Sequence, residues 1–77
     1  MKPFTQRMLK ALERLTKERQ QHPCGGFTTE DMEWQMGVAF TSNEQLYEAI
    51  EELTQAKLIQ YAGYDEEDAI GHCYAIR

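Results

Sequence analysis

The spacing of apolar residues changes near Leu58, and this change limits the folds open to the chain. Before Leu58, apolar residues recur every three to four positions, the pattern of amphipathic helices. The segment from Leu58 to Tyr64 is instead rich in β-formers, and after a polar turn a last segment alternates on one face through Ile70, His72, Tyr74 and Ile76. The pattern predicts helices followed by a C-terminal β-hairpin.

A first helix is predicted from Thr5 to about Gln20. Its apolar face consists of Phe4, Met8, Ala11, Leu12 and Leu15. Pro3 suits a helix start, and His22-Pro23 marks the end because proline disfavours helical geometry in the residue before it. Phe27 stands alone after a loop containing Cys24 and is expected in a very short strand.

Two further helices are predicted from their capping residues. The second begins at Thr28 or Thr29, because Thr28 and Asp31 approximate a capping box, and it ends at Gly37 as C-cap. The third begins after Thr41-Ser42, either of which can cap it, and runs to about Ala56. Its apolar face is the most regular in the chain and consists of Leu46, Ala49, Ile50 and Leu53.

The chain has 77 residues, which is enough for one small domain. Hydrophobic residues make up 42% and charged residues 27%, a globular composition. No stretch approaches the roughly 20 apolar residues that span a bilayer, and the first residues lack the apolar core of a signal peptide, so no membrane role is expected. Two cysteines are too few for a disulfide framework. Free thiols and a cytoplasmic location are therefore predicted.

Three stretches of the chain resemble the winged helix-turn-helix family. Phe27 to Met32 looks like the entry into that family's second helix. Leu46 to Ile59 looks like its third helix and the apolar pair that opens the wing, and Tyr74 to Ile76 looks like its closing strand. The resemblance implies that residues 1–77 form a single winged-helix-like domain. Its fold class would be mainly α with a small antiparallel sheet, comprising three helices and a C-terminal β-hairpin wing.

The family resemblance also implies DNA binding, which the charge distribution opposes. In most members the third helix enters the major groove and the wing touches the DNA backbone. This chain has a net charge of −5, and residues 21–77 carry eleven acidic and only two basic side chains. The third helix is expected to expose Asn43, Glu44, Gln45, Glu48, Glu51 and Glu52, and the wing tip Asp65, Glu66, Glu67 and Asp68. Without lysine or arginine to contact phosphates, ordinary DNA binding is disfavoured.

Residues with catalytic or metal-binding potential are present without a supporting pattern. The residues His22, Cys24, His72 and Cys73 would formally suffice for zinc, but their spacing matches no common zinc module, and adjacent strand residues point to opposite faces. The resemblance would bring the two pairs close, by pairing the strand near Phe27 with the last strand. A Cys24–Cys73 disulfide is disfavoured in a reducing compartment. No cofactor, no metal and no enzymatic activity are therefore predicted.

Aromatic residues outside the apolar stripes suggest an interface. Trp34 points away from the Met32/Met36 core face, Tyr47 lies beside the third helix's stripe, and both can act as interface anchors or cover the edge of the core. The function predicted first is a small acidic winged-helix module that binds a protein partner with a basic surface, as a regulator or as an inhibitor that mimics nucleic-acid charge. Its partner-binding residues are Trp34, Glu44, Tyr47, Glu48, Glu51, Glu52, Asp65, Glu66, Glu67 and Asp68.

The alternative function is a DNA-binding transcription regulator that uses the basic first helix or a homodimer. Residues 1–20 carry six basic and two acidic side chains. The position of the basic residues discriminates the two functions: beside the third helix they favour DNA binding, and on the opposite side they oppose it. These residues are Lys2, Arg7, Lys10, Arg14 and Lys17.

Overall fold

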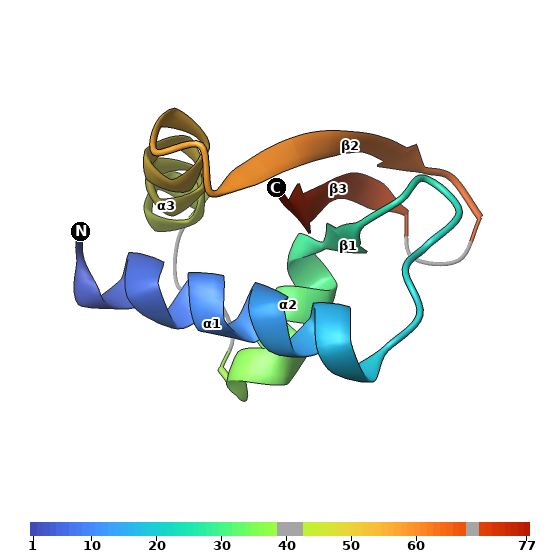
Figure 1. The fold of residues 1–77 in the computed structure, drawn as a ribbon, viewed down its shortest axis with the longest axis horizontal. Coiled ribbons are helices and arrows are strands. Elements are labelled where there is room, and N and C mark those ends of the chain that lie inside the picture. Colours follow the sequence, from blue (N-terminus) through green and yellow to red (C-terminus); the bar gives the residue numbers. More distant parts are fainter. Residues whose placement is uncertain (39–42, 68–69) are drawn as a thin grey trace.

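The computed structural model describes residues 1–38, 43–67 and 70–77. The described elements are, in order, α1 (Pro3–Glu18), β1 (Phe27–Thr28), α2 (Thr29–Met36), α3 (Asn43–Gln55), β2 (Ile59–Asp65) and β3 (Gly71–Ile76). The strands form one antiparallel sheet in the order β1-β3-β2, with β2 and β3 as a C-terminal hairpin (Figure 1). The predicted fold class, mainly α with three helices and a small antiparallel sheet, is confirmed. The expected caps Thr41 and Ser42 lie outside the described residues.

Helix α1 begins and ends close to the predicted positions. Pro3 occupies the first turn, where its missing N–H costs no helical hydrogen bond. The helix ends at Glu18, two residues before the predicted end near Gln20, because Arg19 is already extended. The predicted apolar stripe is buried at Met8, Ala11, Leu12 and Leu15, while Phe4 is partly buried.

Helix α2 has the predicted cap at each end. The Thr28 side chain accepts a hydrogen bond from the Asp31 backbone N–H, and the Asp31 carboxylate accepts one from the Thr28 N–H in return. At the other end Gly37 adopts a left-handed conformation with φ of 72°, which glycine reaches without the steric cost of a Cβ. Local sequence therefore sets both ends of this short helix.

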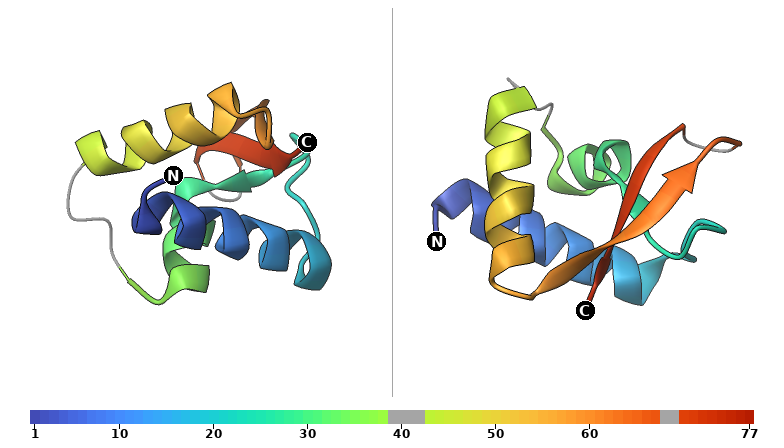
Figure 2. Two further views of the ribbon diagram at one scale, coloured as in Figure 1. Left: turned by 60° about the vertical axis from the view of Figure 1, so that its left-hand side comes forward. Right: turned by 90° about the horizontal axis from the view of Figure 1, so that it is seen from above.

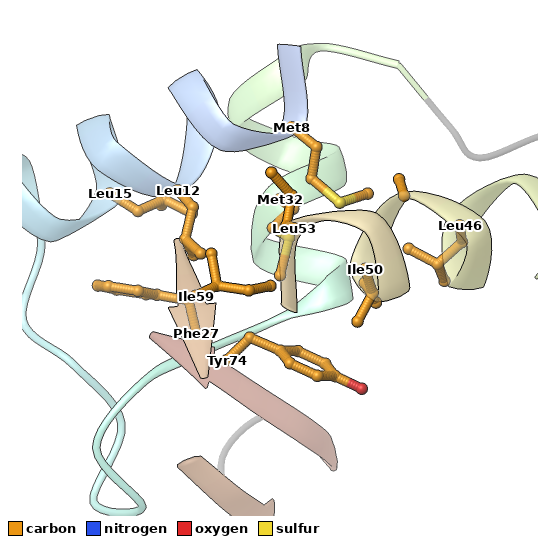
Figure 3. Close-up of a cluster of buried hydrophobic side chains, with 11 residues drawn as sticks. Met8, Leu12, Leu15, Phe27, Met32, Leu46, Ile50, Leu53, Ile59 and Tyr74 are labelled. Carbon is orange, nitrogen blue, oxygen red and sulfur yellow. The ribbon is translucent and has the colours of Figure 1, made fainter. Parts of the chain in front are cut away.

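The three helices and the base of the sheet enclose one core (Figure 3). Leu12, Ile50 and Leu53 are buried in it as predicted, together with Phe27 from β1 and Tyr74 from β3. Figure 2 shows that the hairpin extends away from the helices toward its tip. Its predicted alternation is therefore only half buried: Tyr74 and Ile76 pack against the core, whereas His72 and Ile70 are exposed.

Candidate functional site

The acidic face of α3 is partly used inside the molecule. The Glu48 carboxylate forms an ion pair with the Lys2 ammonium, and Glu52 lies 3.8 Å from the amino group of Met1. The two Glu52 oxygens also accept hydrogen bonds from the Lys2 N–H and the Thr5 hydroxyl. Two of the four predicted acidic residues of α3, Glu48 and Glu52, therefore contact the start of α1. These contacts reduce the negative charge that the two residues offer to a partner.

The other acidic residues of α3 remain on its outer face. Glu44 and Glu51 are exposed. The hydrogen bond described for the Glu51 carboxylate comes from Gln55 of the same helix. Tyr47 lies between them and is 56% exposed. No lysine or arginine occurs between Asn43 and Gln55. The outer face of α3 is thus acidic and aromatic, as predicted.

The basic side chains of α1 lie mainly along α2. Arg7, Lys10 and Arg14 line a shallow surface hollow of about 150 Å³ together with Gln35 and Met36. Their spacing of three and four residues places them in one stripe along the helix. Among the predicted basic residues, Lys2 has a described ion pair with α3, to Glu48. The other side of this hollow is formed by residues of α2, and no residue of α3 lines it.

Trp34 lies apart from the acidic face of α3. Its indole is 74% exposed, and the guanidinium carbon of Arg19 lies 5.0 Å from the centre of its ring. Arg19 follows the last residue of α1, whereas Lys2, the partner of Glu48, precedes the first. A helix of 16 residues is about 24 Å long. The predicted partner-binding residues therefore belong to at least two separate surfaces.

The predicted acidic wing tip is only partly exposed. Glu66 and Glu67 are exposed, but Asp65 is buried, and its Oδ2 lies 3.0 Å from Nδ1 of His22. Asp68 lies outside the described residues. The expectation of a solvated run does not hold at Asp65, because the loop after α1 folds back and covers this carboxylate.

His22 connects three parts of the chain. Its Nε2 lies 2.7 Å from Oδ2 of Asp31, the carboxylate that caps α2, while its Nδ1 faces Asp65 at the end of β2. An imidazole can donate to both carboxylates only when both ring nitrogens carry a proton. The sequence offered no local signal for this cluster, because its members are separated by 9 and 34 positions and meet only in the folded chain.

Cys24 and Cys73 form a disulfide, so the prediction of free thiols is wrong. Pairing of β1 with β3 places Thr28 opposite Cys73 and brings the loop before β1 across the sheet, with the two cysteine Cα atoms 6.8 Å apart. A Cβ on Gly26 would lie 2.6 Å from the Tyr74 carbonyl oxygen. Glycine at this position therefore allows the close approach of the loop to β3.

The formal zinc set is divided among other contacts. The two cysteines are bonded to each other, His22 faces two aspartates, and His72 shares a hydrogen bond with Tyr61. Within the described ranges, no group of three or more histidine, cysteine, aspartate or glutamate side chains could hold a metal ion. No described helix is long and apolar enough to span a membrane.

Exposed rings on the hairpin form a cluster that the predicted site residues do not include. Tyr61 and Tyr64 on β2 both contact His72 on β3. The ring centres are 5.1 Å apart for Tyr64 and His72 and 5.5 Å apart for Tyr61 and His72. The Tyr61 hydroxyl lies 2.9 Å from Nδ1 of His72. The common face of Tyr61, Tyr64 and His72 depends on the strand register, which local spacing does not determine.

Tyr74 joins this cluster to α3. Burial raises the pKa of the Tyr74 phenol, and the neighbouring Tyr47 and Tyr61 raise it further. Its ring centre lies 5.8 Å from that of Tyr61. Figure 3 shows the Tyr74 side chain directed toward the part of α3 that carries Ile50 and Leu46. Tyr74 is therefore the buried residue that Tyr61 of the hairpin and Tyr47 of α3 both neighbour.

Comparisons with protein-family models, curated proteins and solved structures give no match for this chain.

Proposed function

We propose that this chain is a small acidic winged-helix-like module that binds a protein partner with a basic surface. The element order, three helices and a C-terminal hairpin, is compatible with a winged-helix-like topology. The observation that carries the proposal is the absence of lysine and arginine from α3, β2 and β3, together with the exposure of Glu44 and Glu51 on α3 and of Glu66 and Glu67 directly after β2.

Charge favours a basic protein over a nucleic acid as the partner. Lysine and arginine contacts to phosphates supply most non-specific DNA affinity, and repulsion replaces that attraction at an acidic face. The same carboxylates would steer a basic protein surface toward the module and raise its association rate. A regulator or inhibitor that occupies the nucleic-acid site of another protein has this charge requirement.

The second candidate is a DNA-binding transcription regulator. The observation that favours it is the stripe of Arg7, Lys10 and Arg14 on α1. In that case DNA would lie along α1 and α2, and the acidic outer face of α3 would have to point away from the duplex. A homodimer could present two such stripes.

The module is proposed to act without catalysis or a cofactor. The described hollows are open and shallow, and the one beside Trp34 is lined by Glu30, Glu33, Gly37 and Val38 without an opposing acid–base pair. The cytoplasmic prediction rested on free thiols, and the Cys24–Cys73 disulfide removes that basis. A disulfide is retained in oxidising compartments, and we favour such a location.

Charge reversal on α3 tests the proposed function. The wild-type chain is expected not to bind labelled duplex DNA at physiological salt in fluorescence anisotropy. Glu44→Lys/Glu51→Lys should create weak, salt-sensitive and sequence-independent binding, because it installs phosphate contacts on an exposed helix face. Glu48 and Glu52 are left unchanged because their ion pairs with Lys2 and the amino group of Met1 join α3 to the start of α1.

A matched control separates position from net charge. Glu13→Lys/Glu30→Lys changes the net charge by the same amount on exposed positions of α1 and α2. It should bind DNA less than the α3 variant. Tight, sequence-selective DNA binding by the wild-type chain would overturn the proposal and establish the transcription-regulator alternative.

A further inference from the structure

We define the tyrosine row as Tyr47 on α3, Tyr61 and Tyr64 on β2, and His72 on β3. His72 contacts the rings of Tyr61 and Tyr64, and both Tyr61 and Tyr47 neighbour the buried Tyr74. The three tyrosines are 56%, 55% and 47% exposed, respectively. Such a concentration of exposed aromatic surface on a small domain is typical of an interaction site.

A β-bulge places Tyr61 and Tyr64 on the same face of the hairpin. Strand residues three positions apart normally point to opposite faces. Tyr61 pairs with Tyr74 and Gly63 with Cys73, so the register shifts by one residue at Ala62. The extra residue turns Tyr64 back to the face of Tyr61, where it pairs with His72. The row is therefore a product of strand geometry.

The orientation of the rings is set before any partner binds. His72 contacts the rings on both sides of it, and its Nδ1 shares a hydrogen bond with the Tyr61 hydroxyl. Tyr61 in turn packs edge-on against Tyr74, whose ring is buried in the core. Little side-chain freedom would be lost on binding, which favours affinity.

Exposed carboxylates follow the residues of the row on α3 and after β2. Glu51 lies one helical turn after Tyr47, and Glu66 and Glu67 follow directly after β2. Within the described ranges, the one arginine found over an aromatic ring is Arg19 on Trp34, so the rings of the tyrosine row carry no cation of their own. Negative ring faces and flanking carboxylates both attract a positive charge.

Arginine fits this combination better than lysine. Its guanidinium is planar, is weakly hydrated, stacks on aromatic rings and can pair with a carboxylate at the same time. The ammonium of lysine loses more hydration for the same contact. Stacked nucleobases would need positive charge along their phosphates, and the described residues of α3, β2 and β3 include no lysine or arginine.

We propose that the tyrosine row is the arginine-binding surface of the module, which takes an arginine-containing segment of the partner by stacking guanidinium groups on Tyr61 and Tyr64 between flanking glutamates. This rests on the proposed function, which it makes specific in the partner's chemistry and in the surface used.

Two labelled peptides test the proposal. Each is a Gly/Ser peptide with three evenly spaced basic residues, arginine in one and lysine in the other. Fluorescence anisotropy at low salt should show several-fold tighter binding of the arginine peptide. Tyr61→Leu/Tyr64→Leu should weaken that binding about 5- to 30-fold and remove the preference for arginine, since two exposed cation–π contacts are lost.

The controls keep the test independent of folding. Val38→Ala shortens an exposed apolar side chain outside the tyrosine row and should leave binding unchanged. Circular dichroism shows whether the hairpin variant Tyr61→Leu/Tyr64→Leu folds. If it does not, Tyr47→Leu provides a second test outside the hairpin, and it should also weaken binding of the arginine peptide.

Each opposing result has a distinct meaning. Equal binding of both peptides, unaffected by the tyrosine variants but abolished by Glu51→Lys, overturns the tyrosine row and leaves the proposed function standing. Failure of both peptides to bind at low salt overturns both. Sedimentation tests whether the chain associates with itself. Self-association that Arg7→Glu/Arg14→Glu abolishes would show that a second copy occupies the tyrosine row, and it would overturn the proposal of a different protein as partner.

Discussion

The two sides of the β2–β3 hairpin differ in how they are held. On the side toward the loop after α1, Cys73 is bonded to Cys24 and Asp65 is buried against His22. On the opposite side, Tyr61 and Tyr64 are about half exposed. We call the side of Cys73 and Asp65 the closed side and the side of Tyr61 and Tyr64 the open side. The two sides can differ because successive side chains of a strand point to opposite faces. Because the disulfide and the His22–Asp65 contact hold one side of the hairpin, the other side can present rings in fixed positions without burying them.

The closed side should account for more of the domain's stability than the open side, and the disulfide should have the largest effect. Cys24→Ala/Cys73→Ala is expected to lower the free energy of unfolding by about 3–4 kcal/mol, because the crosslink joins positions 49 residues apart. Urea denaturation measures this. A reductant should destabilise the wild type and leave the variant unchanged. An unchanged melting temperature of the reduced wild type would contradict the disulfide and restore the free-thiol prediction.

The second largest effect is expected at His22. His22→Ala should cost about 2 kcal/mol, because it removes the imidazole that lies between the buried Asp65 carboxylate and the Asp31 carboxylate. Adding Asp65→Asn should recover part of the loss, since the charge is then removed as well. The four proteins of this double-mutant cycle are compared by urea denaturation. Strictly additive losses would show that the two side chains do not interact.

Loss of the open-side rings should have a small effect on stability. Tyr61→Leu/Tyr64→Leu is expected to change the free energy of unfolding by less than about 1 kcal/mol, the range for exposed cross-strand pairs. The same urea experiment measures it. A loss as large as that of the disulfide would mean that the rings are structural, and the contrast between the two sides would disappear.

The smallest effect concerns alkaline pH. Because the pKa of Tyr74 is raised in the folded state, its contribution to stability is complete below the unfolded value of 10.0 and is lost as pH rises through the folded pKa. Thermal melts of the wild type should therefore fall above about pH 10. Tyr74→Phe keeps the ring, lacks the ionisable hydroxyl and should show a shallower fall. Identical alkaline slopes would contradict a burial-raised pKa of the Tyr74 phenol in the folded state.

Local patterns determined the helices and their ends. The stripe through Leu12 and Leu15, the capping box of Thr28 and Asp31, and the glycine at position 37 each act within a few residues, so the sequence alone predicted them. The same holds for the acidic outer face of α3, since helical spacing decides which of its residues remain outside. These parts of the candidate site could be predicted.

Only the tertiary structure decided how distant residues combine. The disulfide, the His22 cluster and the separation of Trp34 from Glu48 depend on how the loop after α1 and both ends of α1 pack, and no local spacing encodes that. The tyrosine row depends on a one-residue shift at Ala62, which reverses the face of every later residue in β2. Side-chain spacing determines an element's faces, whereas contacts between elements determine which faces meet.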